Sequence, residues 1–193
     1  MEHLYKRSVI RVYLSGIHRT MMTKNKVLLG LIFVALVSRL VPHYPNFTAM
    51  GALAFFGASR IKSIWGSLAL VVAAMMITDL VINNLIYPTG EFVLMYSGSL
   101  FTYAGFAAYA LLGRKATNMR NGSMLLVGGS IAFFLLSNLG VFLSAYSVFP
   151  MTWGGLMATY AAAIPFHAPE LISTALFSAM AYAAETKFST VKA

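Results

Sequence analysis

Residues 27–48 read VLLGLIFVALVSRLVPHYPNFT and join a long apolar run to a short polar turn. The run carries no charge until Arg39. Pro42 and Pro45 then flank a histidine and a tyrosine, and a second apolar segment begins at Phe47. Proline removes a backbone donor and ends helices. The stretch therefore predicts a membrane-spanning helix, a polar turn and a returning helix.

The composition of the whole chain extends this picture to a membrane protein. Of its 193 residues, 59% are hydrophobic and only 10% are charged, and the mean hydropathy is +0.76. Soluble globular proteins carry about 25% charged residues, so a soluble domain is excluded. Cysteine is absent, which excludes disulfides, thiol catalysis and cysteine-bound metals.

Six apolar segments predict six transmembrane helices in one domain. Lipid-exposed backbone must satisfy its own hydrogen bonds, which favours helices, and runs such as IAFFLL lack the alternation of a membrane barrel. The first two segments are short, because a helix of about 13 residues covers about 20 Å of a hydrocarbon core of roughly 30 Å. The predicted fold class is therefore all-α, a polytopic membrane helical bundle. The expected spans are about 27–41, 47–59, 64–82, 92–113, 124–145 and 169–184.

Lysine and arginine predict which side of the membrane each connector occupies. With six spans, thirteen of the fourteen basic residues share one side, and Arg39 is the exception. That side is expected to be the cytoplasm of a bacterial inner-membrane protein, so the charge of +9 requires no nucleic acid. We expect a basic N-terminal tail at 1–26, a membrane domain at 27–186 and a cytoplasmic C-terminal tail at 187–193. Met22 is an alternative start of translation, which N-terminal mass spectrometry distinguishes.

Polar side chains from four stretches are expected to meet on the outer side. They belong to the first turn, the end of the third span, the middle of the fifth and the start of the sixth. Above them we expect a loop at 146–167 that carries aromatic rings and no Lys, Arg, Asp or Glu. Such polar groups at membrane depth line cavities or pair with one another. The candidate ligand-binding residues are Arg39, His43, Asn46, Asp79, Asn83, Asn138, Trp153 and His167.

Each candidate also has a structural interpretation. Arg39 and Asp79 are expected either to form an ion pair that clamps two helices or to contact a ligand. For Arg39, a third alternative is that its side chain extends to the lipid headgroups. Asn46 is expected to cap the second helix more readily than to bind a ligand. Asn138 either joins helices or lines a pocket. Trp153 either belongs to an interfacial aromatic belt or is presented by a turn.

The two histidines and the acid beside the second of them have similar alternatives. His43 is expected to be exposed at the interface or to contact a ligand. His167 and Glu170 are expected to open the last span, where a glutamate near the helix N-terminus interacts favourably with the helix dipole.

Four blocks of the chain resemble a bacterial family of six-span membrane proteins of uncharacterised function. They are RLVPHYPNFTAMGALAFFG at 39–57, ITDLVINNLIY at 77–87, FFLLSNLGVFL at 133–143 and YAAAIPF at 160–166. The family in turn is similar to the substrate-binding S components of energy-coupling-factor (ECF) vitamin transporters. That resemblance implies six helices, cytoplasmic termini and an outer pocket capped by loops. It also implies an energising partner module, although the first span lacks the Ala-x-x-x-Ala patch on which that module docks.

The sequence thus predicts a membrane protein that binds and transports a small organic, vitamin-like nutrient. Its expected partners are the small-molecule ligand and the lipid bilayer, with the ECF energising module as a further possibility. We expect no enzymatic activity, cofactor, metal or nucleic acid. A scaffold without transport is the first alternative. A membrane-embedded enzyme is the second, with acid, base or metal chemistry drawn from Asp79, Glu91, His43, His167 and Glu170.

Overall fold

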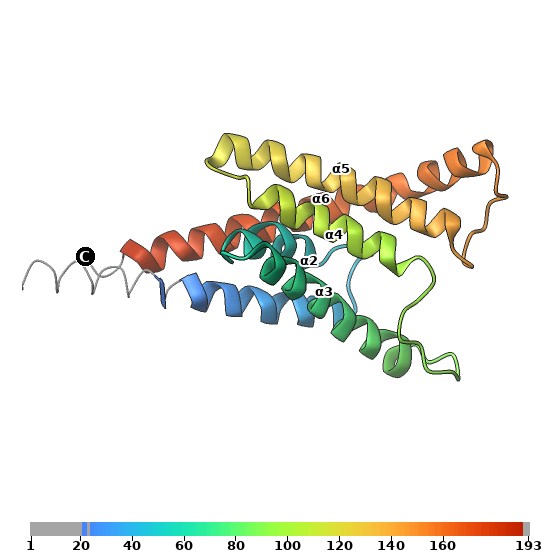
Figure 1. Ribbon diagram of the computed structural model, residues 1–193, viewed down its shortest axis with the longest axis horizontal. Coiled ribbons are helices and arrows are strands. Elements are labelled where there is room, and N and C mark those ends of the chain that lie inside the picture. The colour runs from blue at the N-terminus through green and yellow to red at the C-terminus, as the bar shows by residue number, and fades with distance from the viewer. Residues whose placement is uncertain (1–20, 23, 191–193) are drawn as a thin grey trace, which may run out of the picture.

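A computed structural model describes residues 21–22 and 24–190. This part of the chain is helical and contains no strand, which confirms the predicted all-α class (Figure 1). Most of the expected N-terminal tail and residues 191–193 lie outside the described residues. The first helix covers 24–40. The later elements are α2 (Met50–Ala52), the π-helical η1 (Leu53–Gly57), α3 (Ile64–Val81), the π-helical η2 (Ile82–Ile86), α4 (Ser99–Gly113), α5 (Met119–Leu143) and α6 (Trp153–Thr190).

Two of the helices are long and apolar enough to cross a membrane. They are Ile64–Ile86, which joins α3 to η2, and Met119–Leu143, which is α5; the most apolar part of each has a mean hydropathy of 2.0. The helix Ser99–Gly113 is apolar but shorter. These lengths and compositions suggest membrane association, while the full count of six spans stays a prediction.

The second predicted span is shorter than expected and lies inside the protein. Residues 49–58 are all buried, and the helix formed by 50–59 contains the π-helical segment η1. Ten helical residues extend for about 15 Å, half of a hydrocarbon core. This helix packs against α4 and α6. Its apolar side chains therefore form core contacts instead of meeting lipid.

The last helix differs most from the expectation. Residues 153–167, predicted as a loop, form the first half of α6, although Pro165 and Pro169 interrupt its hydrogen bonding. Pro165 and Pro169 leave the carbonyls of Ala161 and Pro165 without their usual helical donors. Close to them, the side-chain amide of Asn46 donates to the carbonyl of Phe166, at 3.3 Å. The predicted loop thus shrinks to the connector at 144–152.

Basic residues gather at one end of the bundle. Figure 1 shows the end of α4, the start of α5 and the C-terminal half of α6 at the same end. There Arg60 forms an ion pair with Glu185, at 2.8 Å. Arg114 donates to the Ser67 hydroxyl at 2.9 Å and to the carbonyl of Lys62 at 2.7 Å. The basic connectors therefore lie together, as the charge distribution predicted, and their side of the membrane stays a prediction.

Close backbone contact between α4 and η1 requires glycine at position 113. A Cβ added to Gly113 would lie 2.7 Å from the carbonyl carbon of Phe55, which is backbone and cannot move aside easily. We expect Gly113→Ala to lower the free energy of unfolding by about 1–3 kcal/mol through overpacking. Gly30→Ala is the matched control, because a Cβ there meets nothing within 4 Å. Thermal unfolding of the purified variants measures both, and equal melting temperatures would contradict the contact.

Candidate functional site

A cavity of about 790 Å³ opens at the end of the bundle away from the basic connectors. Its walls come from the first helix and the turn after it, from α2, α3, η2, α4, α5 and α6, and from the connector between η2 and α4. Five of the eight candidate residues line it: Arg39, His43, Asn46, Asn138 and His167. The structure thus brings together polar side chains that lie far apart in the sequence.

Arg39 and Asp79 form a closed ion pair at the edge of this cavity. The guanidinium of Arg39 donates to Oδ1 of Asp79 at 2.7 Å and also contacts the sulfur of Met75 at 2.6 Å. The other carboxylate oxygen, Oδ2, accepts from the hydroxyl of Tyr103 at 2.7 Å. Asp79 is 2% exposed. The predicted clamp is therefore present, and both oxygens of the carboxylate are satisfied within the protein.

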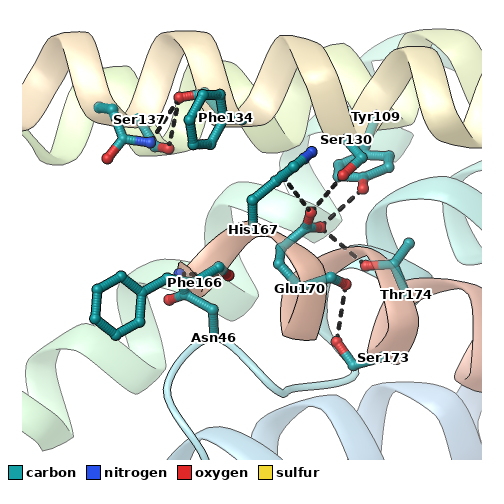
Figure 2. A network of polar contacts seen from close by, with 11 residues as sticks. Asn46, Tyr109, Ser130, Phe134, Ser137, Phe166, His167, Glu170, Ser173 and Thr174 are labelled. Carbon is teal, nitrogen blue, oxygen red and sulfur yellow. Dashed lines mark hydrogen bonds and ion pairs between the residues drawn. The ribbon is translucent and has the colours of Figure 1, made fainter. Parts of the chain in front are cut away.

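A second polar cluster surrounds Glu170 in the middle of α6 (Figure 2). Its Oε1 accepts from the hydroxyl of Tyr109 at 2.8 Å and from that of Thr174 at 3.1 Å, and its Oε2 accepts from Ser130 at 2.6 Å. The residue is 5% exposed. Three helices thus supply donors to one carboxylate. The expectation that Glu170 opens a helix is wrong, because α6 begins 17 residues earlier, at Trp153.

His167 lies between this cluster and the cavity. Its Nδ1 is 3.9 Å from Oε2 of Glu170, and its ring lies 4.7 Å from the ring of Phe134, centre to centre. Nδ1 is buried and has no hydrogen-bond partner among the described residues. Buried polar atoms are normally paired. This nitrogen is therefore an unpaired polar atom beside the cavity and the carboxylate of Glu170.

The remaining candidates on the cavity wall have one polar atom engaged. Asn138 donates its amide to the carbonyl of Phe134, at 2.8 Å, within its own helix. His43 places Nδ1 2.7 Å from the carbonyl of Val41. Asn46 donates to the carbonyl of Phe166 and does not cap a helix, since the residue that precedes α2 is Ala49, without a side-chain cap.

Asn46 also adopts a left-handed backbone conformation, with φ of 62°. Asparagine and glycine tolerate this conformation, whereas alanine is strained there. We expect Asn46→Ala to lower the free energy of unfolding by about 1–2 kcal/mol, and Asn46→Gly to be the milder change. Thermal unfolding compares them. If glycine were as damaging as alanine, the side chain and not the backbone would control this turn.

Besides Asp79, two candidates do not line the cavity. Asn83 is in η2, and its Nδ2 is buried without a partner among the described residues. Trp153 begins α6 and is 75% exposed, so the turn that was expected to present its indole to a ligand is absent. Neither residue lines the cavity.

Several residues of the two carboxylate clusters and of the cavity were not predicted from the sequence. Four hydroxyl side chains in apolar helices show no sign of a function in the sequence, and only the fold brings them to the two carboxylates. They are Tyr103, Tyr109, Ser130 and Thr174. Six aromatic rings also line the cavity, and hydropathy alone assigns such rings to lipid or core. They are Tyr87, Tyr96, Phe106, Phe133, Phe134 and Phe166.

Among the described residues, no group of three or more histidine, aspartate or glutamate side chains is arranged to hold a metal. The chain belongs to a family of unknown function, DUF6580, whose model matches residues 19–191. No curated protein and no solved structure shows significant similarity to it. The likeness to S components therefore stays a prediction.

Proposed function

We propose that this member of the DUF6580 family binds a small organic nutrient in the cavity and carries it across the bacterial inner membrane, in the manner of an ECF S component. The observation that supports the proposal is the cavity itself. Its volume of about 790 Å³ falls within the roughly 300–1,000 Å³ of small-molecule sites. Aromatic rings with a few convergent polar groups are the usual lining of such sites.

The membrane topology is part of the proposal. Helices 24–40 and α4 are too short to span a thick bilayer, α3 with η2 and α5 are long enough, and α6 has 38 residues. We place the basic end in the cytoplasm and the cavity toward the outside, with six passages counting the short buried helix. The ligand enters beside the turn at 41–48 and the connector at 87–98, which hold His43, Asn46, Tyr87 and Tyr96.

A scaffold role is the second candidate, because the buried carboxylates of Asp79 and Glu170 are satisfied by partners within the chain. Polar clusters of this kind hold helices together without any ligand. The two functions predict different effects of a substitution at Asn138. Under the transport proposal, Asn138→Leu folds normally and loses ligand binding, whereas a scaffold has no ligand to lose.

Binding to the purified chain tests the proposal. We expect at least one compound in a broad panel of vitamins and cofactors to raise the melting temperature in detergent. At a hundred times its dissociation constant a ligand adds about 2.7 kcal/mol to the free energy of unfolding. A folded protein that responds to no compound would contradict the proposal.

Single cysteines test the topology, because the natural chain contains none. We expect a cysteine at position 43 to react with a membrane-impermeant maleimide in intact spheroplasts. The matched control is a cysteine at position 115, in the basic connector, which should react only after the membrane is opened. The reverse pattern would place the cavity inside the cell and remove the basis for capture from the exterior.

A further inference from the structure

The polar groups that the cavity leaves free define the chemistry of its ligand. We infer that the site takes a planar aromatic compound that carries hydrogen-bond donors and no negative charge, such as an aromatic amidine or amine. This inference rests on the proposed function and adds the ligand class. An arginine on a cavity wall would favour the opposite, an anionic ligand, if its positive charge were unpaired.

The positive charge of Arg39 is already matched within the protein. Its guanidinium lies 2.7 Å from Asp79, whose side chain is 2% exposed, and its other terminal nitrogen contacts Met75. Taking the carboxylate of a ligand would require Arg39 to leave a buried ion pair. Breaking such a pair leaves an uncompensated charge, which is strongly unfavourable. Arg39 therefore closes the cavity wall and is not an anion-binding group.

The other candidates present acceptors. The amide nitrogen of Asn138 is engaged by its own helix, and that of Asn46 by the carbonyl of Phe166. Each side chain then offers its oxygen, which accepts hydrogen bonds. In His43, Nδ1 faces the carbonyl of Val41 and must carry the proton, so that Nε2 of the neutral ring is an acceptor as well. A ligand that matches these atoms has N–H or O–H groups.

The charge balance favours the same ligand. Once Arg39 and Asp79 cancel, Glu170 is the remaining carboxylate beside the cavity. Three hydroxyl groups donate to it, and Nδ1 of His167 lies 3.9 Å from its Oε2, without a hydrogen-bond partner in the described part of the chain. A ligand rich in hydrogen-bond donors suits this wall of acceptor atoms better than an anion does. His167 itself donates or accepts according to its tautomer.

The ring-lined walls supply the planar part of the preference. Phe106, Phe133, Phe134 and Phe166 face a cavity that also contains Tyr87 and Tyr96. Offset or edge-on packing of aromatic rings is favourable beyond the burial of apolar area, and ring faces attract cations. A flat cationic ring therefore gains from the same surfaces that exclude water.

Three probes with one shape test the inference: naphthalene-2-carboxamidine, its neutral carboxamide and its carboxylate. They are titrated into the full chain in detergent by calorimetry, with empty micelles as the blank. We expect the amidine to bind best and the carboxylate at least tenfold more weakly. Asn138→Leu is expected to weaken amidine binding roughly tenfold, the usual effect of losing a hydrogen bond to a charged group. Asn121→Leu, the same change at a half-buried position at the start of α5 outside the cavity lining, should leave binding unaltered.

The outcomes separate this inference from the proposed function. If the carboxylate binds more tightly than the amidine, and Asn138→Leu abolishes this binding, the ligand class is wrong but the proposed binding function stands. If no probe binds the folded chain while another compound of the panel does, the ligand class is also wrong. If nothing binds at all, both proposals fail. Equal effects of Asn138→Leu and Asn121→Leu would show that the probe binds elsewhere, and would overturn the inference.

Discussion

Replacing Asp79 by alanine is expected to lower the free energy of unfolding by about 3–5 kcal/mol, because removing one partner of a buried ion pair leaves the other charge uncompensated. The carboxylate is 2% exposed and accepts from Arg39 and Tyr103, each at 2.7 Å. In the variant, both donors lose their acceptor. Chemical denaturation in detergent, followed by circular dichroism, measures the change.

A double-mutant cycle isolates the pair. Arg39→Ala is also expected to destabilise the protein, because it leaves Asp79 with the Tyr103 hydroxyl as its remaining donor. The double variant should lose less than the sum of the two single losses, by about 0.5–3 kcal/mol. Strict additivity would contradict the ion pair, since independent residues do not compensate for one another.

Glu170→Ala is expected to lower the free energy of unfolding by about 2–4 kcal/mol, since each buried hydroxyl left without a partner is unfavourable. The hydroxyls of Tyr109, Ser130 and Thr174 come from α4, α5 and α6 and converge on this one side chain. Their loss of a common acceptor should loosen the contact of the three helices. The melting temperature in detergent measures the effect. Glu170→Gln retains one acceptor oxygen, so its melting temperature should fall between those of Glu170→Ala and the natural protein.

Ser178 provides the control for Glu170 on the same helix. Its Oγ is buried but has no hydrogen-bond partner within the described residues, so Ser178→Ala removes no hydrogen bond. We expect this variant to be neutral within about 0.5 kcal/mol, or slightly stabilising. If Ser178→Ala and Glu170→Ala were equally damaging, the loss would reflect general disturbance of α6 and not the cluster.

Local patterns of the sequence predicted the outline of this protein. Hydropathy located α3 and α5 to within a few residues, because a long run of apolar side chains is visible in the sequence itself. The distribution of lysine and arginine predicted which connectors lie together, and Arg39 stood out as the exception. The pairing of Arg39 with Asp79 was one of three alternatives that the sequence left open, and the topology allowed it because it placed the end of the first helix beside the end of the third.

Three features depended on contacts between distant parts of the chain. An apolar segment has the same pattern whether it faces lipid or protein, so the predicted span 47–59 did not show that its helix, 50–59, is short and buried inside the protein. Pro165 and Pro169 favour a loop by their local chemistry, yet α6 continues through them, and Asn46 donates to one of its carbonyls. Glu170 acquires its hydroxyl donors from positions 40 and 61 residues away. Short-range propensity and polarity specify which segments are helical and apolar, whereas the partners of a buried polar atom exist only once the helices have packed.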